Sequence, residues 1–163
     1  TIFFAGQPVP MTRKRFRKAV YKALKDRMKH RDATIFYLQQ SARWLPEMSK
    51  ILKEKQLPDD LKFIPIVESN LTNVTSARGA KGFWQLQTRT ARNFGLSING
   101  AMDQRLDPWA STEAAADYLK MLYDTVGSWP MANRPASVSS LSARATTRPV
   151  VCRGSASPAK RGL

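Results

Sequence analysis

The residues whose chemistry could support catalysis are few, and the first is Glu68. It stands near the end of a segment, residues 61–69, that we expect to be helical and that is apolar on nearly every side. A helix of this kind is usually buried, and burial disfavours a charged carboxylate and raises its pKa. Glu68 is therefore a candidate general acid near neutral pH. The competing interpretation is a helix-end carboxylate paired with one of the 27 Lys and Arg residues.

A glycine-containing segment, residues 76–86 with the sequence SARGAKGFWQL, is the second candidate. Glycines such as Gly82 allow a backbone to approach a ligand closely. Trp84 could stack on a sugar face or fill the core, and Gln85 could hydrogen-bond a polar ligand. A phosphate-binding loop is excluded, because no Gly-Lys-Ser/Thr follows and no strand precedes the segment. A loop that only turns the chain would have the same composition.

The counts of cysteine and histidine exclude several kinds of site. The 163 residues include one cysteine, Cys152, and one histidine, His30. This excludes an intrachain disulfide framework, a cysteine zinc cluster and a site built from several histidines, and it argues against a Ser-His-Asp site. The counts therefore leave no metal site of these two kinds. No apolar run approaches the roughly 20 residues of a membrane span.

The net charge of +15 predicts an anionic partner or a strongly solvated surface. A positive surface attracts nucleic acid, anionic lipid headgroups or anionic cell-wall polymer. For most Lys and Arg residues, solvation at the surface is the better interpretation. Charge alone does not choose between these partners.

The N-terminal part, residues 1–32, is expected to be an extended arm followed by a basic amphipathic helix over 12–31. Its apolar residues recur every four positions and form one stripe: Phe16, Val20, Leu24 and Met28. Such a helix could lie on a membrane or on nucleic acid. Packing of the stripe on the core is the interpretation we favour.

The middle of the chain has helical periodicity throughout. Pro46 is expected to break or kink the helix predicted there, or to lie in the first turn of a second one. The Leu57-Pro58-Asp59-Asp60 sequence is typical of a helix start. A helix over 88–94 and another over 108–126 follow, the second opened by Asp107-Pro108, ended by Gly127 and buried through an apolar stripe. The stripe contains Ala115, Leu119, Leu122 and Val126. With no alternating strand pattern, the predicted fold class is all-α.

Residues 133–163 differ in character from the rest. They contain six Lys and Arg residues but no acid and no aromatic residue, and they are rich in Ser, Ala and Pro. This composition predicts a disordered basic tail.

An ordered series of motifs resembles the lytic murein transglycosylases, the lysozyme-like enzymes of glycoside hydrolase family 23, and most of all their membrane-bound D type. The stretches that carry the resemblance lie between residues 4 and 132. They are VESN at 67–70, SARGAKGFWQL at 76–86, TARNFGL at 90–96, LPDD at 57–60, DQRLDP at 103–108, STEAA at 111–115 and FAGQPVP at 4–10. The resemblance implies a lysozyme-like domain over 33–132.

The resemblance also implies a reaction and a set of roles. Enzymes of this family cut the β-1,4 bond between N-acetylmuramic acid and N-acetylglucosamine and leave a 1,6-anhydro end. Glu68 matches their single catalytic carboxylate, which acts first as acid and then as base. Ser69 would support the glutamate, Ser76 and Gln85 would hold groups of the glycan, and Glu113 matches a family position of less certain role. Gly82 and Trp84 complete the expected substrate-binding set. The implied mechanism needs no metal and no cofactor.

One family motif is missing, and this leaves alternatives open. The family continues with an Ala-Tyr-Asn segment whose Tyr lies beside the catalytic Glu, whereas this match stops after Ala132. A frame-shifted or replaced C-terminal end, and so an incomplete domain, is our hypothesis. A glycan-binding remnant without turnover, a hydrolase that uses water and a nucleic-acid binder are the alternatives, and the last is least expected because no nucleic-acid motif is present.

The implied partner is the peptidoglycan glycan strand, in the bacterial cell envelope. The chain shows no export signal, and a segment that precedes it could provide membrane association. The sequence does not indicate the oligomeric state.

Overall fold

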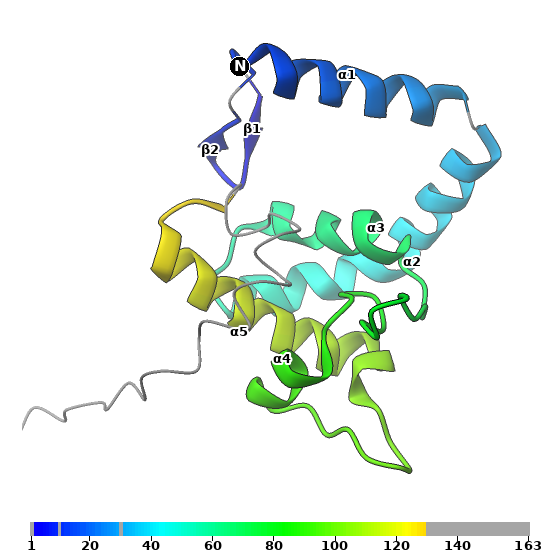
Figure 1. Ribbon diagram of the computed structural model, residues 1–163, viewed down its shortest axis with the longest axis vertical. Coiled ribbons are helices and arrows are strands. Elements are labelled where there is room, and N and C mark those ends of the chain that lie inside the picture. Colours follow the sequence, from blue (N-terminus) through cyan, green and yellow to red (C-terminus); the bar gives the residue numbers. More distant parts are fainter. Residues whose placement is uncertain (1, 10, 30, 130–163) are drawn as a thin grey trace, which may run out of the picture.

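The computed structural model describes residues 2–9, 11–29 and 31–129, and these are mostly helical (Figure 1). The all-α prediction is confirmed, with one small hairpin added. The helices are α1 Lys14–Lys29, α2 Arg31–Glu54, α3 Ile64–Ser69, α4 Thr88–Asn93 and α5 Pro108–Val126, with 3-10 turns η1 Asp59–Phe63 and η2 Gln104–Leu106 and strands β1 Phe3–Phe4 and β2 Gln7–Pro8. Within these ranges, none of the helices is long and apolar enough to cross a membrane.

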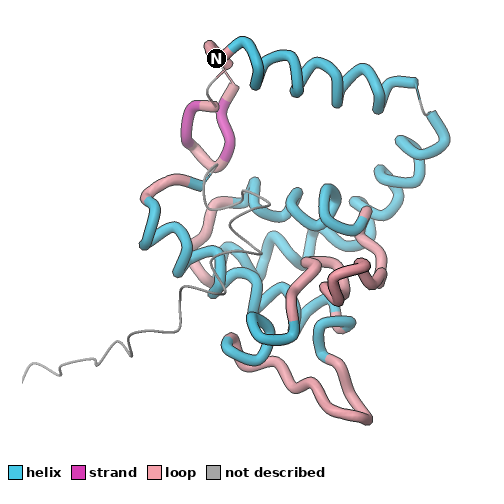
Figure 2. Tube along the Cα trace, viewed as in Figure 1, coloured by secondary structure: helices cyan, strands magenta, loops and turns pink. Residues whose placement is uncertain are grey.

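The core lies where the second half of α2 packs against η1 and α5. Apolar side chains from these elements and from the loops around α4 are removed from water, which is the main term that stabilises such a fold. The most deeply buried are Met48, Leu52, Leu61, Leu71 and Leu122. Figure 2 shows long loops joining α3 to α4 and α4 to α5 on one side of this body.

Helix α5 begins and ends where the sequence predicts. The Asp107 carboxylate accepts hydrogen bonds from the backbone N–H groups of Trp109 and Ala110, so it caps the helix. Gly127 ends it in the left-handed conformation, with φ of 65°. The predicted stripe is buried except at Val126, which is 37% exposed because it lies in the last turn, beyond the core.

Helix α2 runs unbroken through Pro46, so the predicted break and the predicted second helix are wrong. Proline lacks the N–H that would bond to the carbonyl of Ala42, which usually bends a helix. Figure 1 shows α2 curving from the end of α1 into the body. Burial of Leu45 and Met48 on either side of Pro46 offsets the lost hydrogen bond.

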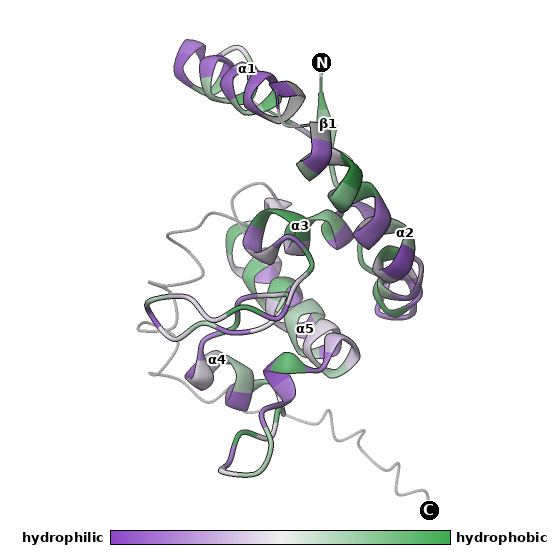
Figure 3. Ribbon diagram, turned by 90° about the vertical axis from the view of Figure 1, so that its right-hand side faces the viewer, coloured by the Kyte–Doolittle hydropathy of each residue, from purple (hydrophilic) through white to green (hydrophobic). Residues whose placement is uncertain are grey.

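Helix α1 does not pack on the core, which corrects the favoured prediction. It contacts α2, but Phe16 is 38% exposed and Leu24 is 55% exposed, and only Val20 is half-buried. The side chain of Met28 lies outside the described part of the chain. Figure 3 shows α1 as hydrophilic purple turns interrupted by short green stretches, at the margin of the molecule.

The predicted extended arm is a β-hairpin that is docked on the body. Strands β1 and β2 are joined by Ala5 and Gly6, whose φ angles are both positive, as the tightest hairpin turns require. The backbone N–H of Ala5 donates to the Asp60 carboxylate at 2.8 Å. The Gln7 side chain bonds to the backbone of Gly127 and Trp129. The hairpin therefore bridges η1 and the end of α5, while the predicted tail at 133–163 lies outside the described residues.

Candidate active site

Glu68 lies in the last turn of α3, a short helix that follows η1 directly. The segment 61–69 is less buried than predicted, because Phe63 and Val67 are 43% and 79% exposed. They lie four residues apart and share one face of the segment, so only the opposite face packs on the core. Glu68 is half-buried at the boundary between the two faces.

The Glu68 carboxylate has no ion pair and no hydrogen bond among the residues that the structure describes. The competing interpretation, a helix-end glutamate paired with Lys or Arg, is therefore not supported there. Burial raises the pKa of Glu68 above the usual value for glutamate. A carboxylic acid in this setting is suited to hold a proton and give it to a substrate.

Ser69, next to Glu68, is buried and turned inward. Its hydroxyl forms hydrogen bonds with the carbonyl oxygens of Pro65, at 3.1 Å, and of Phe83, at 2.8 Å. The first contact is within the turn of α3, and the second joins α3 to the loop over 74–86. With its hydroxyl engaged in this way, Ser69 ties the segment of Glu68 to the loop.

The loop over 74–86 folds back on itself twice. Isolated bridges pair Lys81 with both Thr75 and Leu86, so three stretches of backbone lie side by side. Gly82 donates its N–H to the carbonyl of Val74, which closes the first turn. This compact shape brings backbone and side chains of the loop next to the end of α3.

Gly82 is required by a backbone contact within the protein, while its predicted role in substrate binding stays a prediction. Its φ of +76° is unfavourable for other residues, and a Cβ atom there would stand 1.8 Å from the carbonyl oxygen of Arg105. The close approach is between the 74–86 loop and η2. Gly79 has a similar φ of +78° but open space around it.

Trp84 fills the core, which corrects its predicted role in binding. It is 5% exposed, so its ring is not available to stack on a sugar. Its indole N–H donates to the Thr112 hydroxyl at 2.8 Å and fixes the loop to α5. Of the two interpretations that the sequence leaves open, the structure supports core packing.

Gln85 and Ser76 stabilise the loop and keep part of their polar capacity. The Gln85 amide nitrogen donates to the carbonyls of Val74 and Gly82 at 3.0 and 2.8 Å, while its amide oxygen has no donor in the described ranges. The Ser76 hydroxyl accepts from the N–H of Ala80 at 3.0 Å, which leaves its proton for another acceptor. Gln85 is itself held at a positive φ of 48°.

Asp103 and Arg105 fix the loop from outside, and sequence reasoning missed this role. The buried Arg105 guanidinium binds both oxygens of Asp103, at 2.9 and 2.7 Å, and donates to the carbonyls of Gly79 and Leu86. The Arg105 hydrogen bonds hold the pKa of Asp103 well below its usual range. The available signal was the acidic and basic pair two residues apart in DQRLDP. The carbonyls that Arg105 binds, however, are 19 and 26 residues away in the sequence.

Glu113 is not joined to these groups by any contact in the described part of the chain. It lies exposed on α5 and forms an ion pair with Lys55 at 2.9 Å, and Lys55 also binds Asp117 at 2.8 Å. The pair links α5 to the residue that follows α2. Glu113 is thus placed where it ties two helices together.

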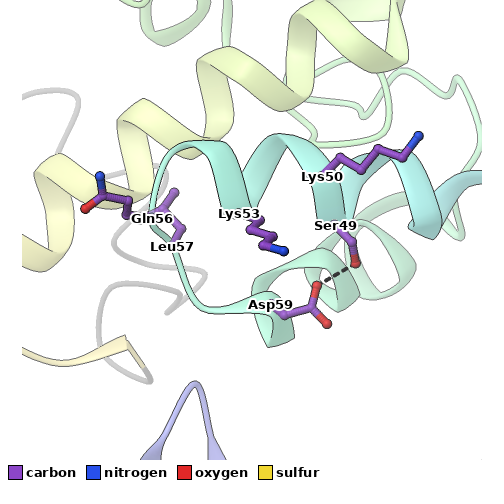
Figure 4. Close-up of a pocket in the computed structure, with 6 residues that line it drawn as sticks. All are labelled: Ser49, Lys50, Lys53, Gln56, Leu57 and Asp59. Carbon is purple, nitrogen blue, oxygen red and sulfur yellow. Dashed lines mark hydrogen bonds between the residues drawn. The ribbon is translucent and has the colours of Figure 1, made fainter.

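A shallow pocket of about 430 Å³ lies elsewhere, beside the C-terminal half of α2 (Figure 4). In the close-up, Ser49 is bonded to Asp59 across it, and Lys53 points toward the same side as Asp59. Lys62 also binds Asp59, which holds the pKa of that carboxyl below its usual value. None of the residues around Glu68 lines this pocket, which is an open surface hollow between α2 and η1.

The described residues hold no group of three or more His, Cys, Asp or Glu side chains that could bind a metal ion. The chemistry available around α3 is therefore that of a single perturbed carboxylic acid, exposed apolar side chains and the polar groups of the loop. That combination can protonate a leaving oxygen and recover the proton later.

Comparison with known proteins gives a family match and two partial matches to relatives. Residues 48–135, a little more than half of the chain, match the family model described as the transglycosylase SLT domain. Membrane-bound lytic murein transglycosylase D of Escherichia coli strain K12 is 39% identical over 72 residues, which are 44% of this chain and 16% of that enzyme. A protein of Alteromonas sp. strain M-1 named for resistance to tributyltin chloride is 33% identical over 94 residues, 55% of this chain and 45% of that protein.

The matches cover less than half of each of these relatives. The family model, in contrast, spans α3 with Glu68, the 74–86 loop, η2 and α5. The mostly helical architecture fits the lysozyme-like fold that the sequence predicts. On this evidence the chain belongs to the transglycosylase SLT domain family.

Proposed function

We propose that this chain acts on peptidoglycan as a lytic transglycosylase, with Glu68 as its catalytic residue. The observation that carries the proposal is a half-buried carboxylate with a raised pKa, unpaired among the described residues, in the domain that the family model matches. The glycan substrate follows from the family, because the Escherichia coli relative is named for murein.

The proposed reaction needs one carboxyl group. Protonated Glu68 gives its proton to the bridging oxygen as the bond from that oxygen to C1 of N-acetylmuramic acid breaks. The C6 hydroxyl of the same sugar then bonds to C1, and the Glu68 carboxylate takes the hydroxyl proton. The products are a free 4-hydroxyl end and a 1,6-anhydro end, and Glu68 is again protonated.

Two other acids, Asp103 and Glu113, are held in ion pairs, and this supports the single-carboxylate route over hydrolysis by water. Direct hydrolysis normally uses a second carboxylate to position the water or the intermediate. Asp103, the next acid after Glu68, is bound by Arg105, and Glu113 is bound by Lys55. The sugar hydroxyl would replace the missing second group.

Gln85 and Ser76 are the proposed contacts for polar groups of the glycan. The free amide oxygen of Gln85 would accept from an N-acetyl N–H or a hydroxyl, and the Ser76 hydroxyl would donate to a carbonyl. Ser69 would act as a positioning residue. Glu113 would act by fixing α5 to the end of α2.

The substrate also implies the place of action. We propose the bacterial cell envelope, since peptidoglycan is found there. The alternative is a glycan-binding remnant, favoured by the end of the family match at residue 135 and the absence of the Ala-Tyr-Asn segment.

Mass spectrometry of purified peptidoglycan incubated with the chain tests the proposal. We expect anhydro-muramyl ends, with a rate about 10²- to 10⁴-fold lower for Glu68→Gln, the range that general acid–base catalysis contributes. Glu54→Gln makes the same chemical change at an exposed acid of α2 and is the control. Reducing ends instead of anhydro ends would indicate hydrolysis. Release of no fragment by a folded sample that still binds glycan would support the remnant.

A further inference from the structure

Helix α1 carries exposed apolar side chains that the body of the protein does not cover. Phe16, Tyr21 and Leu24 are 38%, 63% and 55% exposed. In an ordinary soluble helix, apolar side chains that recur every four residues, as Phe16, Val20 and Leu24 do, pack on the core. The body over residues 39–129 does bury its periodic apolar residues, for example Leu119 and Leu122 of α5. Helix α1 therefore differs in its surroundings from α5 and from the second half of α2.

The opposite side of α1 is strongly basic. The helix contains eight Lys and Arg residues and a single acid, Asp26. Because residues three and four apart lie on one face of a helix, Lys18, Lys22, Lys25 and Lys29 line the side away from Phe16 and Val20. A basic face and an apolar face together are typical of helices that lie in a membrane interface.

The segments that flank α1 add further exposed apolar side chains. They come from β1, before α1, and from the first two turns of α2, after it. They are Ile2, Phe3, Ile35, Phe36 and Leu38. In Figure 1 the hairpin, α1 and the start of α2 form an arch on one side of the body. The exposed apolar groups of residues 2–38 thus belong to one continuous part of the fold.

We propose that α1 binds the surface of an anionic lipid bilayer, with its apolar stripe among the acyl chains and its Lys and Arg residues at the headgroups. Each basic residue near an anionic surface favours binding, and the apolar residues add the burial of their own surface. This function is separate from glycan cleavage and does not depend on Glu68.

Two other occupants are less favoured by the same observations. A nucleic acid would be attracted by the charge but would leave Phe16, Tyr21 and Leu24 in water. A second copy of the chain would bring two strongly basic helices together, and like charges repel. An anionic bilayer is the partner that satisfies both faces of α1.

Vesicle flotation with the full chain tests the proposal. Vesicles of phosphatidylcholine alone are compared with vesicles that contain one quarter phosphatidylglycerol, at low and at high salt. We expect binding to the anionic vesicles only, and a dissociation constant at least tenfold weaker for Phe16→Asp/Leu24→Asp. Met102→Asp/Val126→Asp makes the same charge change at exposed apolar residues of the body and should bind like the unaltered chain.

Circular dichroism of each variant shows whether it is folded, and Lys18→Gln/Lys22→Gln/Lys25→Gln tests the basic face should the aspartate variant not fold. Binding that falls with salt but is equal in the Phe16/Leu24 variant and the control would overturn the proposal in favour of a soluble polyanion. A dimer in sedimentation equilibrium that the Phe16/Leu24 variant dissociates, without vesicle binding, would overturn it in favour of a second copy.

Discussion

The hydroxyl of Ser69 donates a 2.8 Å hydrogen bond to the carbonyl oxygen of Phe83, 14 residues further along the chain. This bond joins the last turn of α3 to the 74–86 loop. Glu68 precedes Ser69, and Gln85 follows Phe83 by two residues. The proposed acid and a proposed glycan contact are therefore positioned by one buried link.

Ser69→Ala should lower kcat more than it raises KM, because it loosens Glu68 relative to the loop without removing a ligand contact. The buried Phe83 carbonyl would lose this donor, at a cost of about 1–3 kcal/mol in unfolding free energy. Steady-state kinetics and urea unfolding measure the two effects. Ser111→Ala, which removes a buried hydroxyl bonded within its own helix, is the control and should leave kcat unchanged. An equal loss of kcat in both variants would contradict the positioning role.

Gly82→Ala should be far more destabilising than Gly79→Ala. Both glycines have positive φ, which costs a residue with a side chain about 1–2 kcal/mol. Only at Gly82 would the new Cβ meet the Arg105 carbonyl, so the loop or η2 must also move, and we expect a total above about 3 kcal/mol. Thermal melts of the two variants provide the comparison, and similar melting temperatures would show that the approach to Arg105 is not tight.

Arg105→Met should unfold the loop more readily, because the Asp103 carboxylate would keep only its ion pair with Lys81 and the carbonyls of Gly79 and Leu86 would each lose a donor. Breaking a buried ion pair from one side costs about 3–5 kcal/mol. The double variant Arg105→Met/Asp103→Asn should recover part of this loss, since it removes the carboxylate charge that has lost its Arg105 partner. Hydrogen exchange of the 74–86 amides reports the loop directly. A double variant as unstable as the sum of the single variants would contradict the coupling.

The two perturbed acids should change stability with pH in opposite directions. The pKa of Asp103 is lowered in the fold, so its contribution is present above the usual pKa of aspartate and is lost as the pH falls below it. The pKa of Glu68 is raised, so the folded state loses stability as the pH rises above the usual pKa of glutamate.

Glu68→Gln should therefore melt at a higher temperature than the unaltered chain at pH 7 and at nearly the same temperature at pH 4. The difference should grow across that interval and then level off. Melting curves in a series of buffers test this, with Glu54→Gln as the exposed control. A difference that does not change with pH would mean that Glu68 ionises as freely in the fold as in the unfolded chain.

Features that depend on neighbouring residues in the chain could be predicted from the sequence. Helix α5 is the clearest case, since Asp107 and Gly127 define its ends through bonds within a few positions. Glu68 could be proposed as the acid because its apolar neighbours and its place in the motif series are both visible in the sequence. The α4 helix and its end near Gly95 were predicted for the same local reasons.

Features that depend on distant contacts could not be predicted. Trp84 looks the same in the sequence whether it meets a sugar or the hydroxyl of Thr112, 28 residues away. The requirement for Gly82 arises from the backbone of Arg105. Phe16 and Val67 are exposed because no neighbouring element packs fully over their side chains. Such facts depend on how elements meet in space, which periodicity does not specify.

The docked hairpin has a consequence for the order of folding. Its bonds from Gln7 to Gly127 and Trp129 span 120 and 122 residues, so forming them from an open chain requires a large loss of chain entropy. Once α2, η1 and α5 have packed, only the segment from the hairpin through α1 to the start of α2 remains to be closed. The hairpin should therefore attach last and detach first, and protease sites in α1 should become accessible before the core unfolds.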